Sequence, residues 1–170
     1  MEQSQENNKI LLHACCGICS GYPISLLQEE GYVPVVYFCN PNLDTEEEFN
    51  RRLEALQKVC SHFGVELIVE PYNHKEFLDF VKGLENEPER GARCDKCIKL
   101  RLTKAFQKAK ELGIKQFTTS LVISPHKNFQ KISQIGESFC ETNLDISYLS
   151  QDFKKKDGFL KTNNISKELG

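Results

Sequence analysis

Short apolar segments alternate with longer amphipathic ones along this chain, and this alternation constrains its fold more than any other feature. Residues 10–15 are an apolar run of strand length, and residues 33–39 are rich in β-branched and aromatic side chains. Further strands are expected at residues 66–70, 116–123 and 146–149. Because strands that alternate with helices form parallel sheets, the pattern predicts an α/β fold: a single domain with a mostly parallel five-stranded sheet flanked by helices.

Segments with helical spacing separate these strands. In the clearest one, Thr45 and Glu48 form a capping box, the apolar residues recur on one face as far as Phe63, and Gly64 ends the helix. Other helices are expected at about residues 20–30, 75–84, 95–112 and 128–140.

The composition is that of an ordinary globular protein. The chain has 170 residues and a net charge of -2, so it has no overall basic field, and a nucleic-acid partner would need a local basic face. Residues 1–9 form a polar tail without the apolar segment of a signal peptide, which leaves one domain at residues 10–170. No apolar run approaches the length of a membrane span, so we expect a cytoplasmic protein without a membrane partner.

The loops that follow the first, second and fourth strands are expected to meet at one edge of the sheet, where α/β proteins bind ligands. Asn40, Asn42 and Ser124 lie in these loops and are predicted to contact a substrate. Neither G-x-G-x-x-G nor G-x-x-x-x-G-K occurs in the sequence, so ATP or NAD chemistry is not supported.

Five of the eight cysteines gather in two short motifs. Cys15, Cys16 and Cys19 lie at the end of the first strand, and Cys94 and Cys97 form a C-x-x-C just before a helix or in its first turn. A helix N-terminus stabilises thiolates, and four thiolates from two pairs suit a cubane iron–sulfur cluster or a tetrahedral zinc.

Three kinds of thiol site remain open from the residues alone. A structural zinc usually takes two C-x-x-C pairs on short ribbons, whereas one pair here is adjacent and ends a core strand, which favours the cluster over a zinc binding module. A thiol–disulfide oxidoreductase without metal could use Cys94 and Cys97 or Cys16 and Cys19, but the second pair would leave Cys15 unexplained. Cys60 and Cys140 are expected to be structural. Cys39, at the end of the second strand, could line the site, but a role as a small buried hydrophobic residue is favoured.

Five motifs in order resemble the epoxyqueuosine reductases of the QueH type, over about residues 10–170. They are H-A-C-C-G-I-C-S at 13–20, F-C-N-P-N at 38–42, G-A-R-C-D-K-C-I-K-L-R-L at 91–102, T-T-S-L-V-I-S-P-H-K-N at 118–128 and D-F-K-K-K-D-G at 152–158. The resemblance implies a fold similar to the adenine-nucleotide α-hydrolases, with cysteines in place of the nucleotide loop. It also implies a cobalamin-independent oxidoreductase that reduces epoxyqueuosine in tRNA to queuosine by two electrons.

The resemblance implies a metal centre as well. By motif, Cys15, Cys16, Cys94 and Cys97 would hold a 4Fe–4S cluster, and Cys19 would face an additional mononuclear iron. Family members usually have Pro where this chain has Ile18. They also continue to a C-terminal Cys-Gly-Cys, which is missing from this sequence and leaves the electron path open.

Reduction of an epoxide needs a proton donor. The candidates near the predicted crevice are His126, Asp152 and His13, although a histidine within a strand is more often part of a core.

The expected partners are tRNA and an unidentified electron donor. Arg93, Lys96, Lys99 and Arg101 flank the second cysteine pair. Arg93 and Arg101 are favoured as contacts to RNA phosphates over the lysine run at 154–156, because such a run is usually a solvated face. Aromatic candidates for stacking on a splayed base are Tyr37, Phe38 and Phe129, each of which could instead pack in the core.

Overall fold

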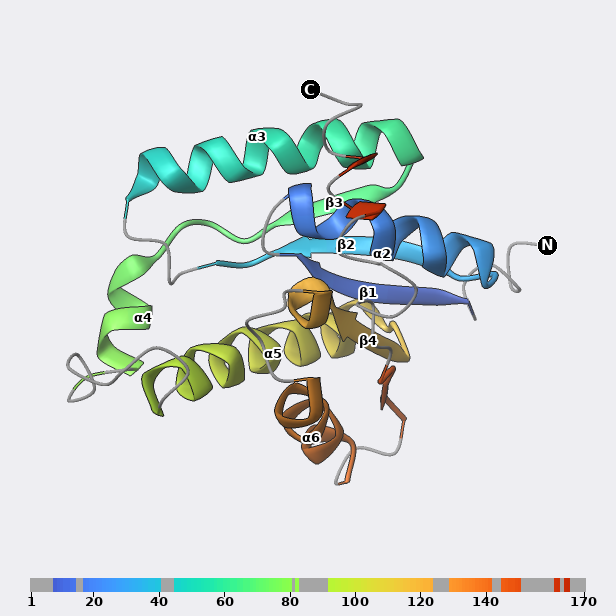
Figure 1. Cartoon of the computed structure of the whole chain (residues 1–170). Coiled ribbons are helices and arrows are strands. Elements are labelled where there is room, and N and C mark those ends of the chain that lie inside the picture. The colour runs from blue at the N-terminus through green and yellow to red at the C-terminus, as the bar shows by residue number, and fades with distance from the viewer. Residues whose placement is uncertain are drawn as a thin grey trace.

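A parallel five-stranded sheet forms the centre of the molecule (Figure 1). The computed structural model describes residues 8–14, 17–40, 45–80, 82, 92–123, 129–141, 145–150, 161–162 and 164–165, with the backbone alone for 17–19, 76–77, 80, 92–95 and 122–123. The strands are β1 (Lys9–Ala14), β2 (Val33–Phe38), β3 (Glu66–Val69), β4 (Gln116–Thr119) and β5 (Ser147–Tyr148). Their order is β3-β2-β1-β4-β5, and every pair is parallel, so the predicted fold class is confirmed.

Helices cover both faces of this sheet (Figure 1). The helices α2 (Gly17–Glu29) and α3 (Glu46–Phe63) pack together on one face. On the other face α5 (Ala92–Leu112) packs against α6 (Phe129–Cys140), and the short α4 (His74–Phe80) adjoins α5. None of the described helices is both long enough and apolar enough to cross a membrane.

The central strand β1 sets the position of the crevice. Residues 10–14 of β1 are completely buried, because β2 and β4 flank the strand and helices cover both sheet faces. His13 pairs in register with Tyr37 of β2 and Thr119 of β4, so the three strands end at the same edge. The strands that follow β1 along the chain lie on both sides of it, β2 on one side and β4 on the other, and α/β proteins bind their ligands at such a switch point.

The caps of α3 are as predicted. Thr45 accepts a hydrogen bond from the backbone N–H of Glu48 at 3.1 Å. Gly64 ends the helix with φ of 67°, a left-handed conformation that favours glycine.

Two helices begin earlier than predicted, and both carry cysteines. α2 starts at Gly17 instead of residue 20, which places Cys19 in its first turn. α5 starts at Ala92 instead of residue 95, so Cys94 and Cys97 both lie within the helix. Neither start has the Ser, Thr or Asp cap with which the sequence marks α3, and the boundaries were therefore misplaced.

The predicted strand at 116–123 is wrong in its second half. The strand ends at Thr119, and residues Ser120–Ile123 form a 3-10 helix, η1. The hydroxyl of Thr119 accepts a hydrogen bond from the backbone N–H of Leu121 at 3.1 Å, and this local bond turns the chain out of the sheet.

A C-terminal segment packs on α2. Thr162 is buried, and its hydroxyl accepts a hydrogen bond from the backbone N–H of Tyr22 at 3.3 Å. A Cβ atom at Gly21 would lie 2.9 Å from Ile165 Cγ2, so glycine permits this close approach.

Candidate metal centre

Backbone elements place the two cysteine motifs. Ala14 ends β1 directly before Cys15, and Cys94 and Cys97 lie in the first two turns of α5. Cys15 and Cys16 are outside the described residues, and only the backbone of Cys19 and Cys94 is described. The Cys97 side chain is described, is 7% exposed, and packs with Leu100.

One face of α5 carries the thiols and a buried arginine. Cys94, Cys97 and Arg101 are spaced by three and four residues, which places them on the same side of the helix. The Arg101 side chain is 5% exposed. Because side chains on a helix lean toward its N-terminus, Arg101 leans toward the turn that holds Cys97.

Asn40 connects this face of α5 to the end of β1. Its Nδ2 donates a hydrogen bond to the Ala14 carbonyl at 3.0 Å, and its Oδ1 accepts one from Arg101 Nη1 at 3.1 Å. Asn40 is 2% exposed and follows β2 directly. The side chains of Asn40 and Arg101 therefore connect Ala14, the residue before Cys15, to the face of α5 on which the second cysteine pair lies.

His13 is held by hydrogen bonds at both ring nitrogens. Nε2 donates to the Cys39 carbonyl at 3.0 Å, so Nδ1 of the neutral ring accepts from the Thr119 hydroxyl at 3.0 Å. These contacts tie the ends of β1, β2 and β4 together, which is the core position that a strand histidine usually takes. A proton-donor role for His13 stays a prediction.

The other predicted site residues are less fully described. Arg93 is described by its backbone alone. Four residues lie outside the described residues: Asn42, Ser124, His126 and Asp152. Tyr37 and Phe38 are buried in the sheet, so their predicted role in stacking on a base is wrong, while Phe129 is half-buried at the start of α6.

The cysteines outside the two motifs are free thiols that are buried or half-buried. Burial raises the pKa of Cys39 to about 11 and that of Cys60 to about 12, so both stay protonated at neutral pH. Cys140 is half-buried, and burial raises its pKa as well. Among the described side chains, no three of His, Cys, Asp and Glu lie close enough to hold a metal ion.

The donor set nevertheless fits an anionic metal–thiolate centre. Within the described residues, Nε of the buried Arg101 has no hydrogen-bond partner. A buried guanidinium is costly unless an anion or acceptor pairs with it, and cysteines that bound a metal on the same helix face would be anionic thiolates. A cationic, donor-rich position therefore adjoins the cysteine motifs.

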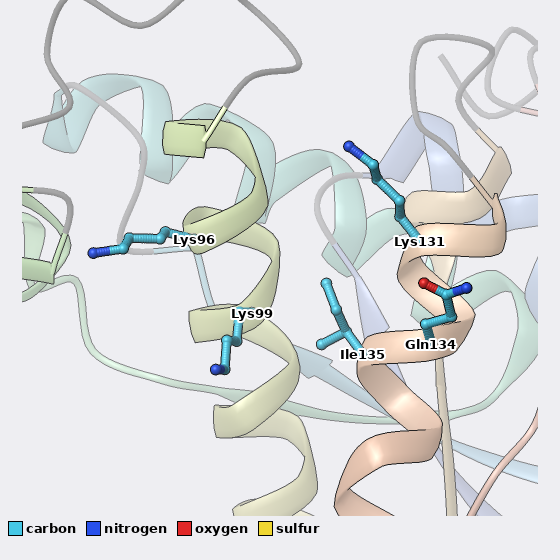
Figure 2. Close-up of a pocket in the computed structure, with 5 residues that line it drawn as sticks. All are labelled: Lys96, Lys99, Lys131, Gln134 and Ile135. Carbon is cyan, nitrogen blue, oxygen red and sulfur yellow. The ribbon is translucent and has the colours of Figure 1, made fainter.

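A basic hollow lies between α5 and α6 (Figure 2). It measures about 340 Å³ and is lined by Lys96, Lys99, Lys131, Gln134 and Ile135. Figure 2 shows Ile135 pointing from α6 toward α5, with Lys131 one turn away. By helical spacing, Lys96 and Lys99 lie on the face of α5 opposite Cys94 and Cys97. Sequence analysis did not single out Lys131, because this residue lies in α6, outside the five motifs.

The architecture and the cysteine motifs define a class: α/β proteins with a parallel five-stranded sheet and cysteine motifs that follow β1 and lie in α5. Two solved structures share the fold. A predicted subunit of a tRNA methyltransferase from Methanocaldococcus jannaschii has a TM-score of 0.58 at 13% identity and matches 94% of this chain and 75% of its own. The U34-tRNA thiolase NcsA from Methanococcus maripaludis, solved with its [4Fe-4S] cluster, has a TM-score of 0.55 at 14% identity. The match covers 98% of this chain and 59% of the thiolase chain.

Sequence relatives narrow this class to one family. The family profile described as "Epoxyqueuosine reductase QueH" matches residues 10–170. The enzyme of that name from Streptococcus pyogenes is 36% identical over 98% of this chain and 67% of its own length. The enzyme of the same name from Haemophilus influenzae is 34% identical over 98% of this chain and 68% of its own length. The chain belongs to the epoxyqueuosine reductase QueH family.

Proposed function

We propose that this protein reduces epoxyqueuosine in tRNA to queuosine, without cobalamin, by means of a 4Fe–4S cluster and an adjacent iron. The family match over residues 10–170, with all five motif cysteines present, carries this proposal. The hydrogen bonds that join Ala14, Asn40 and Arg101 support it, because they connect the elements on which the two cysteine motifs lie.

The proposed ligands follow the two motifs. Cys15, Cys16, Cys94 and Cys97 hold the cluster, and Cys19, in the first turn of α2, faces the adjacent iron. When bound, such a centre supplies electrons one at a time and a Lewis acid for the epoxide oxygen. The fold accommodates a cluster of this type in the thiolase NcsA.

The protein supplies orientation and protons. Conversion of an epoxide to an alkene consumes two electrons and two protons and releases water, and His126 and Asp152 are the proposed proton donors. Arg93, Asn42 and Ser124 are proposed to hold the substrate at the edge where β1, β2 and β4 end.

The proposed partners are a tRNA that carries epoxyqueuosine and an electron donor still to be identified. The hollow between α5 and α6 provides the local basic face that a chain of net charge -2 needs for RNA. A cytoplasmic location, where thiols stay reduced, suits both the substrate and the cluster.

Anaerobic purification followed by iron, sulfide and zinc analysis tests the proposal. The wild type should be brown, absorb near ~400 nm and contain iron and sulfide, and it should convert epoxyqueuosine in tRNA when given a strong reductant. Cys97→Ser should lose most of the iron and sulfide and most of the activity. Cys140→Ser, a matched change on α6, should keep the iron, the sulfide and the activity. Colourless protein with stoichiometric zinc, or a metal-free disulfide, would overturn the proposal.

A further inference from the structure

Arg101 is a buried cation with unused hydrogen-bonding capacity. Its side chain is 5% exposed, Nη1 donates to Asn40, and Nε lacks a partner among the described residues. Leaving a buried donor unsatisfied is unfavourable, and more so when the group is charged. An acceptor that pairs with this N–H would remove that cost.

The contacts of Arg101 locate the unpaired group. Arg101 shares one face of α5 with Cys94 and Cys97 and leans toward their turns of the helix. Through Asn40 the guanidinium is also tied to the Ala14 carbonyl, one residue before Cys15. The guanidinium is therefore connected by hydrogen bonds to the residue before the first motif and by its own helix to the second motif.

We propose that Asn40 and Arg101 are a positioning pair for the iron–sulfur centre: Asn40 holds the two cysteine motifs in register, and Arg101 Nε–H donates to an anionic sulfur of the centre. This inference rests on the proposed function and assigns both residues to the cofactor rather than to direct contact with substrate. Hydrogen bonds to the sulfurs of a cluster stabilise its reduced, more negative state. Arg101 therefore raises the reduction potential, and Asn40 acts mainly on cluster retention.

The two residues should consequently give different signatures. Arg101→Gln removes the charge and should lower the midpoint potential. Asn40→Ala should leave the potential of the remaining clusters close to that of wild type, while iron is lost to a chelator about 10- to 100-fold more readily, as is typical when a residue that orients metal ligands is removed. Arg101→Lys retains the charge but not the planar donor fork, so it should lose iron faster and keep a higher potential than Arg101→Gln.

The experiment compares anaerobically purified wild type with these three variants. Iron and sulfide content, the midpoint potential from a spectroscopic redox titration, and the rate of iron release to a chelator are measured, with circular dichroism as the test of folding. Arg52→Gln on α3, whose guanidinium pairs with Glu48 on the opposite sheet face, is the matched control and should change none of them.

The outcomes separate this inference from the proposed function. A wild type without iron and sulfide overturns both. A wild type that holds the cluster, together with a folded Arg101→Gln variant of unchanged potential and iron release, overturns the inference alone. If Arg101→Gln does not fold, Arg101→Lys decides, and wild-type iron release and potential in that variant would again overturn the inference.

Discussion

Cys60 shows how a single buried thiol couples the stability of this protein to pH. The residue lies on the buried face of α3, and burial raises its pKa from 9.0 to about 12. Above pH 9 the unfolded chain loses the thiol proton, but the folded protein keeps it. The stabilisation is therefore complete below pH 9 and declines as the pH rises toward 12.

The decline should amount to about 1.4 kcal/mol per pH unit from this group. Cys60→Ala removes this titration, so its free energy of unfolding should fall less steeply than that of wild type between pH 9 and 11. Denaturant unfolding of anaerobic protein at several pH values measures both slopes. Ser61→Ala, an exposed neighbour, should follow wild type, and a parallel curve for Cys60→Ala would contradict the prediction.

The hydrogen bond between Asn40 and Arg101 is a feature of two single residues that sequence analysis could not predict. The two residues were predicted separately, each as a contact to the substrate or to RNA. Their hydrogen bond joins positions 61 residues apart, and no local pattern encodes such a pair. His13 was different, because a histidine inside an apolar strand already indicates a core role, and its two hydrogen bonds fit that role.

At the scale of elements, α6 approaches β5 so closely that only glycine fits between them. A Cβ atom at Gly136 would lie 2.5 Å from Tyr148 Cδ2, and the Tyr148 ring packs in turn on Phe117 with a centroid distance of 5.2 Å. Gly136→Ala should therefore destabilise the protein by about 1–3 kcal/mol, because the ring or the helix must move.

Urea denaturation provides the measurement. The gain in helix propensity from glycine to alanine is about 1 kcal/mol and opposes the effect, so a stabilised Gly136→Ala variant would show that the ring gives way freely. Gln130→Ala, an exposed change on the same helix, is the control and should stay within about 0.5 kcal/mol of wild type.

The elements that sequence analysis placed well are those with strong local signals. α3 has both caps and a clear apolar stripe, and β1 and β2 are apolar runs of strand length. The starts of α2 and α5 carry no such caps, and packing against the sheet decides where they begin. The thiol motifs could therefore be assigned by residue type, but not their positions within the helices.

Across the whole molecule, α5 presents two different surfaces. On its cysteine face, Arg101 is joined through Asn40 to the end of β1, and its lysine face borders the hollow against α6 (Figure 2). A helix with its side chains is about 10–12 Å across, so under the proposed function RNA bound in the hollow would lie beside the proposed metal centre and not on it. The division suits an enzyme that must hold a long polyanion while it reduces one base.

Charge reversal on the lysine face tests this arrangement. Lys99→Glu should weaken tRNA binding and reduce the slope of log affinity against log salt concentration by about 1, because fewer counterions are released when one phosphate contact is lost. Cluster content and midpoint potential should not change, since Lys99 lies opposite the cysteine face of α5. Lys58→Glu makes the same charge change on α3, across the sheet, and should leave the slope intact. Equal losses of affinity in the two variants would mean that tRNA responds only to net charge, and the hollow would then have no part in holding it.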